Sequence, residues 1–133
     1  MRDSQRSKVY SAERGLREPP FNTMQETQAF VDSVCKTKYW CNLGGLPTTA
    51  TDGRGRRTAC GYYGGEICLP KWSRQRIIIL HELAHTVIGD APWHGREFAR
   101  TLLALVNRFM GKGAAAKLRE AFKENHVHWK AGA

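Results

Sequence analysis

Residues 73–89 show the apolar periodicity of a helix and carry two histidines four positions apart, His81 and His85. An apolar stripe at i, i+3, i+4 and i+7 would face a core; it consists of Leu80, Leu83, Ala84 and Val87. Ser73 is a suitable N-cap and Gly89 a natural stop for this helix. The two histidines fall on a flanking face of the helix, so the segment predicts a core helix with paired imidazoles on one side.

The spacing of this pair is typical of a metal site. Side chains four residues apart in a helix lie one turn apart on the same face, so the rings of His81 and His85 can bind one ion. Glu82 directly follows the first histidine and can take a proton from a water that the metal activates. This is the arrangement of a zinc-dependent hydrolase. The alternative of two ordinary histidines beside an accidental glutamate is less favoured, given the helical context.

A catalytic zinc ion usually takes three protein ligands and keeps one position for water. His94 ranks first as the third ligand, because residues 89–93 include a proline and can turn the chain back toward the metal. Glu97, one turn further on, is the runner-up. Asp90 is also a candidate, but it is better suited to orient a histidine ring than to bind the ion.

These motifs also resemble known families. His81-Glu82-Leu83-Ala84-His85 followed by His94-Gly95-Arg96-Glu97-Phe98 resembles the SprT/Spartan-type zincin proteases, which pair HExxH with a later HGxxF. A closer resemblance is to a small family of metallohydrolases of actinobacteria and their phages. Its pattern extends over residues 2–6, 9–13, 53–57 and 67–74. The resemblance implies zinc bound by His81, His85 and His94, with Glu82 as catalytic base, and implies no particular substrate.

The layout of the whole chain predicts an α+β fold of a minimal zincin-like type. We expect a small antiparallel or mixed sheet of about three strands, packed against about four helices, with HExxH on the central helix. Besides the metal helix, helical segments are expected over 3–17, from Thr23 to 34, 94–109 and 114–122. One domain is expected over 1–133, with an N-terminal helix within 1–20 and a C-terminal tail at 126–133.

The three strands are expected at 48–51, 58–63 and 66–69. Asp52-Gly53 predicts a hairpin between the first two, and Gly64-Gly65 a second hairpin. We expect the third strand to lie beside the cleft with a free edge that could accept an extended peptide.

The cysteines require a separate prediction. They form no C-x-x-C pair, and without a secretory signal free thiols are the default. A two-residue turn at Gly64-Gly65 would pair Tyr63 with Glu66 and place Cys60 and Cys68 on opposite faces. A three-residue turn would bring these cysteines face to face. The sequence does not choose between the turns, and we expect reduced core thiols at Cys35, Cys41, Cys60 and Cys68.

The net charge and the expected location limit the classes of partner. The net charge of +9 comes from 21 Lys and Arg against 12 Asp and Glu, which favours polyanions. No zinc-finger, helix-turn-helix or RNA-recognition pattern accompanies it, so nucleic acid is a possible partner and a peptide or protein is the expected substrate. No signal segment or membrane span is expected. A cytoplasmic location follows, in the host if the chain is phage-encoded.

The expected activity is therefore that of a zinc-dependent hydrolase, in particular a metallopeptidase with Glu82 as general base. The alternatives are a basic zinc-containing module that binds nucleic acid or a protein without proteolysis, and a purely structural zinc site. The residue that stabilises the transition state is left unassigned. His126, His128, Tyr62 and Tyr63 are weak candidates for it.

Overall fold

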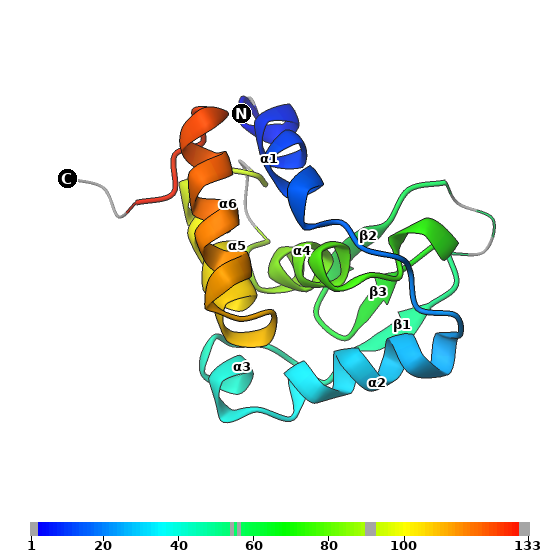
Figure 1. The fold of residues 1–133 in the computed structure, drawn as a ribbon. Coiled ribbons are helices and arrows are strands. Elements are labelled where there is room, and N and C mark those ends of the chain that lie inside the picture. Colours follow the sequence, from blue (N-terminus) through cyan, green and yellow to red (C-terminus); the bar gives the residue numbers. More distant parts are fainter. Residues whose placement is uncertain (1–2, 54, 56, 90–92, 131–133) are drawn as a thin grey trace. The chain divides into compact units, whose positions relative to one another are not determined.

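The computed structural model describes residues 3–53, 55, 57–89 and 93–130 of the 133-residue chain (Figure 1). Within these residues, six α-helices accompany one three-stranded mixed sheet, which confirms the predicted small α+β fold. The elements are α1 (Arg6–Glu13), η1 (Arg14–Leu16), α2 (Met24–Cys35), α3 (Lys38–Asn42), β1 (Thr49–Thr51), β2 (Cys60–Tyr63), β3 (Glu66–Cys68), η2 (Lys71–Ser73), α4 (Arg76–Val87), α5 (Arg96–Phe109) and α6 (Lys112–Glu124). The zincin-like character of the fold stays a prediction.

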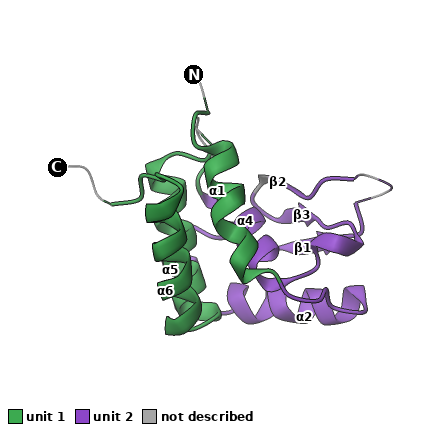
Figure 2. Cartoon of the chain, turned by 45° about the horizontal axis from the view of Figure 1, so that its top comes forward, with its two compact units in different colours: residues 1–17, 88–133 green, residues 18–87 purple. Residues whose placement is uncertain are grey.

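The chain divides into two compact units, one of residues 18–87 and one of residues 1–17 with 88–133 (Figure 2). The first holds the sheet with α2, α3 and α4, and the second holds α1, α5 and α6. The single domain expected over 1–133 also stays a prediction.

In the unit of residues 18–87, α2 begins at the cap that the sequence predicts. The Thr23 hydroxyl oxygen caps the helix by accepting the Glu26 backbone N–H at 3.0 Å, and the hydroxyl donates to the Glu26 carboxylate at 3.2 Å. The same helix packs beside β1 (Figure 1). Its Gln28 amide donates to the Thr48 carbonyl at 2.9 Å and accepts the Ala50 N–H at 2.7 Å. Gln28 therefore occupies hydrogen-bonding groups along the outer edge of β1.

The order of the strands is β1-β3-β2, which contradicts the hairpin predicted at Asp52-Gly53. β1 pairs in parallel with β3, with Ala50 opposite Ile67. A Cβ atom at Gly53 would lie 3.3 Å from the Pro70 ring, so the chain after β1 passes close to the segment that follows β3. The free edge expected on the third strand is also wrong, because β3 is hydrogen-bonded on both sides.

The hairpin of β2 and β3 has the two-residue turn, since Tyr63 pairs with Glu66. The register then shifts along β2, and Cys60 comes to lie opposite Cys68. Such a shift is the effect of a β-bulge, which adds a residue to one strand and exchanges its faces. The two cysteines form a disulfide across a Cα–Cα distance of 5.2 Å. The prediction of reduced thiols is therefore wrong for this pair.

The other two cysteines are free thiols, as predicted, but neither belongs to the core. Cys35 is half-buried, and this burial raises the pKa of its thiol. Cys41 is exposed at the end of α3, a short helix that the sequence analysis did not foresee.

The helix α4 is buried along most of its length, from Ile77 to Ala84, and packs against β2. It starts at Arg76, two residues later than a helix capped by Ser73 would. Ser73 does not cap it: Ser73 lies in η2, and its hydroxyl donates to the Pro70 carbonyl at 2.6 Å. A Cβ atom at Gly61 of β2 would come within 3.0 Å of the Glu82 carbonyl oxygen. Glycine thus lets the strand backbone touch the helix backbone.

In the other unit, α6 packs against both α5 and α1, and the pairing of α5 with α6 is visible in Figure 1. The three helices share a core of buried apolar side chains from Val9, Ala12, Phe98, Leu102, Leu105, Val106, Ala115, Leu118 and Phe122. The helices predicted in these segments are confirmed with shifted ends. Beyond α6, residues 126–130 form a non-helical tail, as predicted.

We expect Gly61→Ala to lower the free energy of unfolding by about 1–3 kcal/mol, because the new methyl group overlaps the Glu82 carbonyl and the strand must move away from α4. Thermal and denaturant unfolding would measure the change. Gly113→Ala is the matched control, since a Cβ atom there meets nothing within 4 Å. It should leave stability unchanged or raise it by less than about 1 kcal/mol. Equal stability of the two variants would contradict the close contact.

Candidate metal centre

His81 and His85 lie one turn apart on α4, and their rings meet edge to face. His81 is 0 % exposed and His85 is half-buried. The two Nε2 atoms are 3.2 Å apart, and the ring planes cross at 68°. Two nitrogens bound tetrahedrally to one zinc ion at about 2.0–2.1 Å would themselves be roughly 3.3 Å apart. The pair therefore already has the spacing that a shared zinc ion requires.

Glu82 lies between these histidines in the sequence and is 4 % exposed. It stands on the part of α4 that touches β2, where its own carbonyl faces Gly61. Helix and strand together fix the backbone from which the carboxylate projects. A buried carboxylate on a rigid element suits a proton acceptor that must stay in one position.

An ion pair fixes the start of the same helix. The Arg76 guanidinium donates two hydrogen bonds to the Glu18 carboxylate, at 2.7 and 3.0 Å. These hydrogen bonds lower the pKa of Glu18 and raise the pKa of Arg76. The Glu18 N–H donates to the side chain of Gln75 at 3.0 Å. The segment before α2 is thereby tied to the first turn of the helix that carries the histidine pair.

His94 belongs to the other unit, in the turn just before α5, and is 5 % exposed. Its Nδ1 is 2.8 Å from one carboxylate oxygen of Asp3, and its backbone N–H donates to the other oxygen at 3.3 Å. The rings of Tyr10 and Phe98 flank the imidazole at centroid distances of 5.3 and 5.1 Å. The ring is therefore held in one orientation by two aromatic neighbours and one carboxylate.

The contact with Asp3 decides which nitrogen of His94 can bind a metal. A carboxylate only accepts hydrogen bonds, so Nδ1 carries a proton toward Asp3, and Nε2 is the nitrogen that a metal ion would use. Histidine ligands of zinc are commonly oriented by a carboxylate in this way. The sequence analysis gave this orienting role to Asp90, which lies outside the described residues. Asp3 was missed because it is 91 positions from His94, and residues this far apart share no local sequence pattern.

Gln5 supports the same turn and was also missed. It is 6 % exposed, and its amide N–H₂ group donates to the carbonyls of His94 at 3.0 Å and His128 at 3.2 Å. Its amide oxygen accepts the His128 backbone N–H. One buried side chain thus fixes the backbone of the His94 turn and of the C-terminal tail.

The remaining candidates from the sequence are less well placed. Glu97 is on the first turn of α5, but its side chain is exposed. His126 and His128 are exposed in the tail. The side chains of Tyr62 and Tyr63 lie outside the described part of the chain. The structure therefore offers His81, His85 and His94 as the buried or half-buried imidazoles of this chain.

We expect Asp3→Ala to destabilise the unit of residues 1–17 and 88–133, because it removes both hydrogen bonds to the buried His94. The loss should be about 1–3 kcal/mol in thermal unfolding. Ser4→Ala is the control, since Ser4 is the exposed neighbour of Asp3 and should be neutral. If the Asp3 variant unfolds at the same temperature as the Ser4 variant, Asp3 does not hold His94.

Comparison of the chain with protein-family models, with curated proteins and with solved structures finds no match. What the chain does is therefore inferred from its own residues. The paired imidazoles on α4, the buried glutamate between them and the carboxylate-held His94 are the features that bear on its chemistry.

Proposed function

We propose that this chain is a zinc-dependent hydrolase, in particular a metallopeptidase. The observation that carries the proposal is the pair of Nε2 atoms of His81 and His85, 3.2 Å apart on a buried helix, with Glu82 between them in the sequence. A purely structural zinc site has no use for a buried glutamate next to its ligands.

His94 is the proposed third ligand. Together with the pair on α4 it would supply three imidazoles to one metal ion. Asp3 contacts its Nδ1, so Nε2 is the nitrogen that would bind the ion, and Glu97 is exposed. Three neutral imidazoles suit zinc and leave one of its four positions open. Cys60 and Cys68 are joined in a disulfide, so neither offers a thiolate.

The chemistry would divide between the ion and the chain. When bound there, zinc would lower the pKa of a water molecule and polarise the carbonyl under attack. Glu82 would accept the proton of the attacking water at its carboxylate and then deliver it to the nitrogen of the leaving amine. Asp3 would hold the Nδ1 proton of His94 throughout.

A peptide is the proposed substrate class, and β2 is the proposed strand that aligns it. The sequence analysis chose the third strand for this role, but β3 is central in the sheet and has no free edge. Among the described strands, β2 is an edge strand and also packs against α4. An extended peptide paired with β2 would therefore run beside the helix that carries Glu82.

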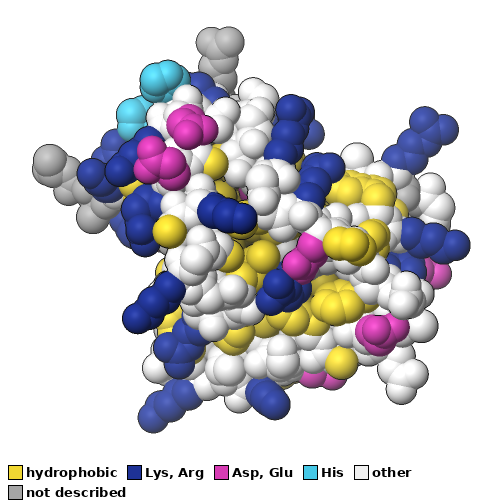
Figure 3. Space-filling view, viewed as in Figure 1, with side chains coloured by type: hydrophobic (Ala, Val, Ile, Leu, Met, Phe, Trp, Pro, Cys, Tyr) yellow, Lys and Arg dark blue, Asp and Glu magenta, His cyan; other side chains and the backbone are white. Residues whose placement is uncertain are grey.

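Nucleic acid remains the second candidate partner because of the net charge of +9. On the face seen in Figure 3, Lys and Arg side chains are spread over the surface and do not form one continuous track. Dispersed charges of this kind fit solubility as well as binding. We therefore rank proteolysis above a binding-only role.

The location of the protein is a separate question. Among the described helices, none combines the length and the apolar character that a membrane crossing requires. The cytoplasmic location stays a prediction, and the Cys60–Cys68 disulfide weighs against a reducing compartment.

Glu82→Gln tests the proposed base. The substitution keeps the size of the side chain but removes the carboxylate, so zinc content should be unchanged and peptide cleavage should fall by about 10²–10⁴-fold. Mass spectrometry of a proteome-derived peptide library incubated with zinc-loaded protein would measure cleavage. Glu124→Gln, on the exposed end of α6, should behave as the parent. Cleavage by the Glu82 variant at the parent rate would refute the assignment.

A pair of variants tests the third ligand. We expect His94→Ala to weaken zinc binding by at least about tenfold, because one of three ligands is lost, whereas Glu97→Ala should bind like the parent. Competition with a chromogenic chelator gives the affinity without any assay of activity. The reverse outcome, with weaker binding only in the Glu97 variant, would move the ligand role to Glu97.

A further inference from the structure

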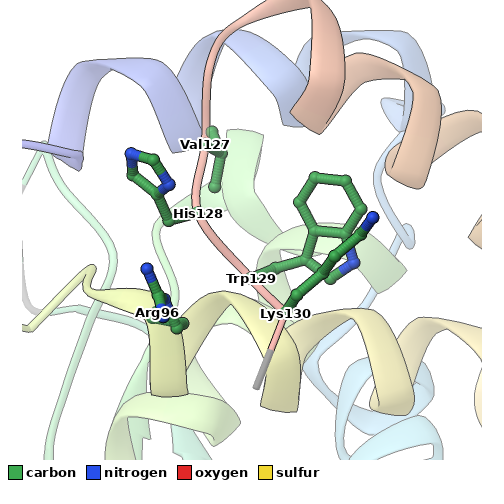
Figure 4. A pocket seen from close by; sticks show the side chains of 5 residues that line it. All are labelled: Arg96, Val127, His128, Trp129 and Lys130. Atoms are coloured by element: carbon green, nitrogen blue, oxygen red, sulfur yellow. The ribbon is translucent and has the colours of Figure 1, made fainter. Parts of the chain in front are cut away.

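The C-terminal tail and the first residue of α5 line a small cavity. Its volume is about 150 Å³, and it is bordered by Arg96, Val127, His128, Trp129 and Lys130 (Figure 4). The close-up shows the Arg96 side chain rising from α5 toward His128, while Lys130 lies beside the Trp129 indole. No Asp or Glu is among the described residues that border the cavity, and its charged lining residues are basic.

The walls of this cavity are held in place. Val127 is buried, and its backbone N–H donates to the Phe122 carbonyl at 2.9 Å. The Trp129 ring packs against the Phe122 ring at a centroid distance of 5.7 Å. Gln5 holds the backbone of His128 on both its N–H and its carbonyl. The cavity is therefore part of the packed unit and not a gap beneath a loose tail.

The charges around the cavity have no acidic partner among the described residues. Neither Arg96 nor Lys130 takes part in an ion pair with a described residue. The Lys130 ammonium instead lies 5.6 Å from the centre of the Trp129 ring. Two permanent positive charges over an apolar floor favour an anion, and a guanidinium presents the fork that an oxyanion fits.

We propose that this cavity is a subsite that binds the C-terminal carboxylate of the peptide substrate. The inference rests on the proposed peptidase function. The volume suits this group, because 150 Å³ corresponds to roughly five water molecules, enough for a carboxyl group and a short stem. A nucleic-acid strand needs a longer groove along its backbone.

Gln5 connects the subsite to the proposed metal ligand. The same amide that holds the His128 backbone also donates to the His94 carbonyl at 3.0 Å, and Arg96 follows His94 by two residues. A carboxylate bound by Arg96 is therefore kept at a fixed separation from the His94 turn. Such an anchor would select peptides with a negative charge at a set distance from the bond that is cut.

Binding by the zinc-loaded Glu82→Gln variant tests the subsite without turnover. The probes are a fluorescein-labelled, alanine-rich hexapeptide with a free C-terminal carboxylate and the same peptide ending in an amide. In fluorescence anisotropy, the acid should bind about five- to tenfold more tightly than the amide. Adding Arg96→Ala should abolish this preference, and Arg96→Lys should retain part of it. Arg100→Ala, exposed one turn further along α5, should leave the preference intact.

Four outcomes would overturn the subsite. The acid and the amide could bind equally, or Arg96→Ala could behave like Arg100→Ala. The preference could also persist in Arg96→Ala and vanish on chelation, which would assign the carboxylate to the metal. A single-stranded oligonucleotide that binds more tightly than the peptide, and depends on Arg96 alone, would assign the cavity to nucleic acid. Failure of the parent to cleave peptides would refute the proposed function separately, because this binding measurement involves no cleavage.

Discussion

The contact between β2 and α4 is the interaction on which the candidate site depends most. Gly61 has no side chain, so the strand backbone can lie directly against the backbone of Glu82. The helix is buried from Ile77 to Ala84 around this contact, which removes its freedom to rotate or slide. His81 and His85 therefore point where the helix places them, with their Nε2 atoms 3.2 Å apart. A rigid element of this kind holds side chains in the fixed positions that a metal site needs.

The strand that makes this contact is itself shaped by a register shift. A plain two-residue hairpin would have left Cys60 and Cys68 on opposite faces, but the shift places them opposite each other and a disulfide joins them. Cys60 immediately precedes Gly61, so the covalent link lies next to the point where β2 meets α4. The disulfide thus restrains the edge strand along which we propose that a peptide binds. This couples the shape of the hairpin to the surroundings of Glu82.

Structural features that depend on residues close in the sequence could be predicted. Contacts between segments distant in the sequence could not. The helix α4 follows from apolar periodicity, and the Thr23 cap and the Gly64-Gly65 turn follow from local chemistry. The parallel pairing of β1 with β3 does not follow from local chemistry. It requires the chain to pass from β1 beyond β3 to β2, and Gly53 lies close to Pro70 on this path. The role of Asp3 could not be derived either, since no local pattern relates a residue near the N-terminus to a histidine 91 positions away. The disulfide depends on a register shift in the hairpin, and no single residue type in the sequence indicates that shift.

X-ray absorption at the zinc K-edge of the zinc-loaded protein tests the central claim most directly, because it counts the atoms bound to the ion. The account predicts three imidazole nitrogens and one further light atom, all at about 2.0–2.1 Å, with no sulfur neighbour. The free thiols of Cys35 and Cys41 are the alternative zinc ligands that this measurement would detect. A spectrum with sulfur at about 2.3 Å, or with fewer than two imidazoles, would contradict a metal centre built on His81 and His85.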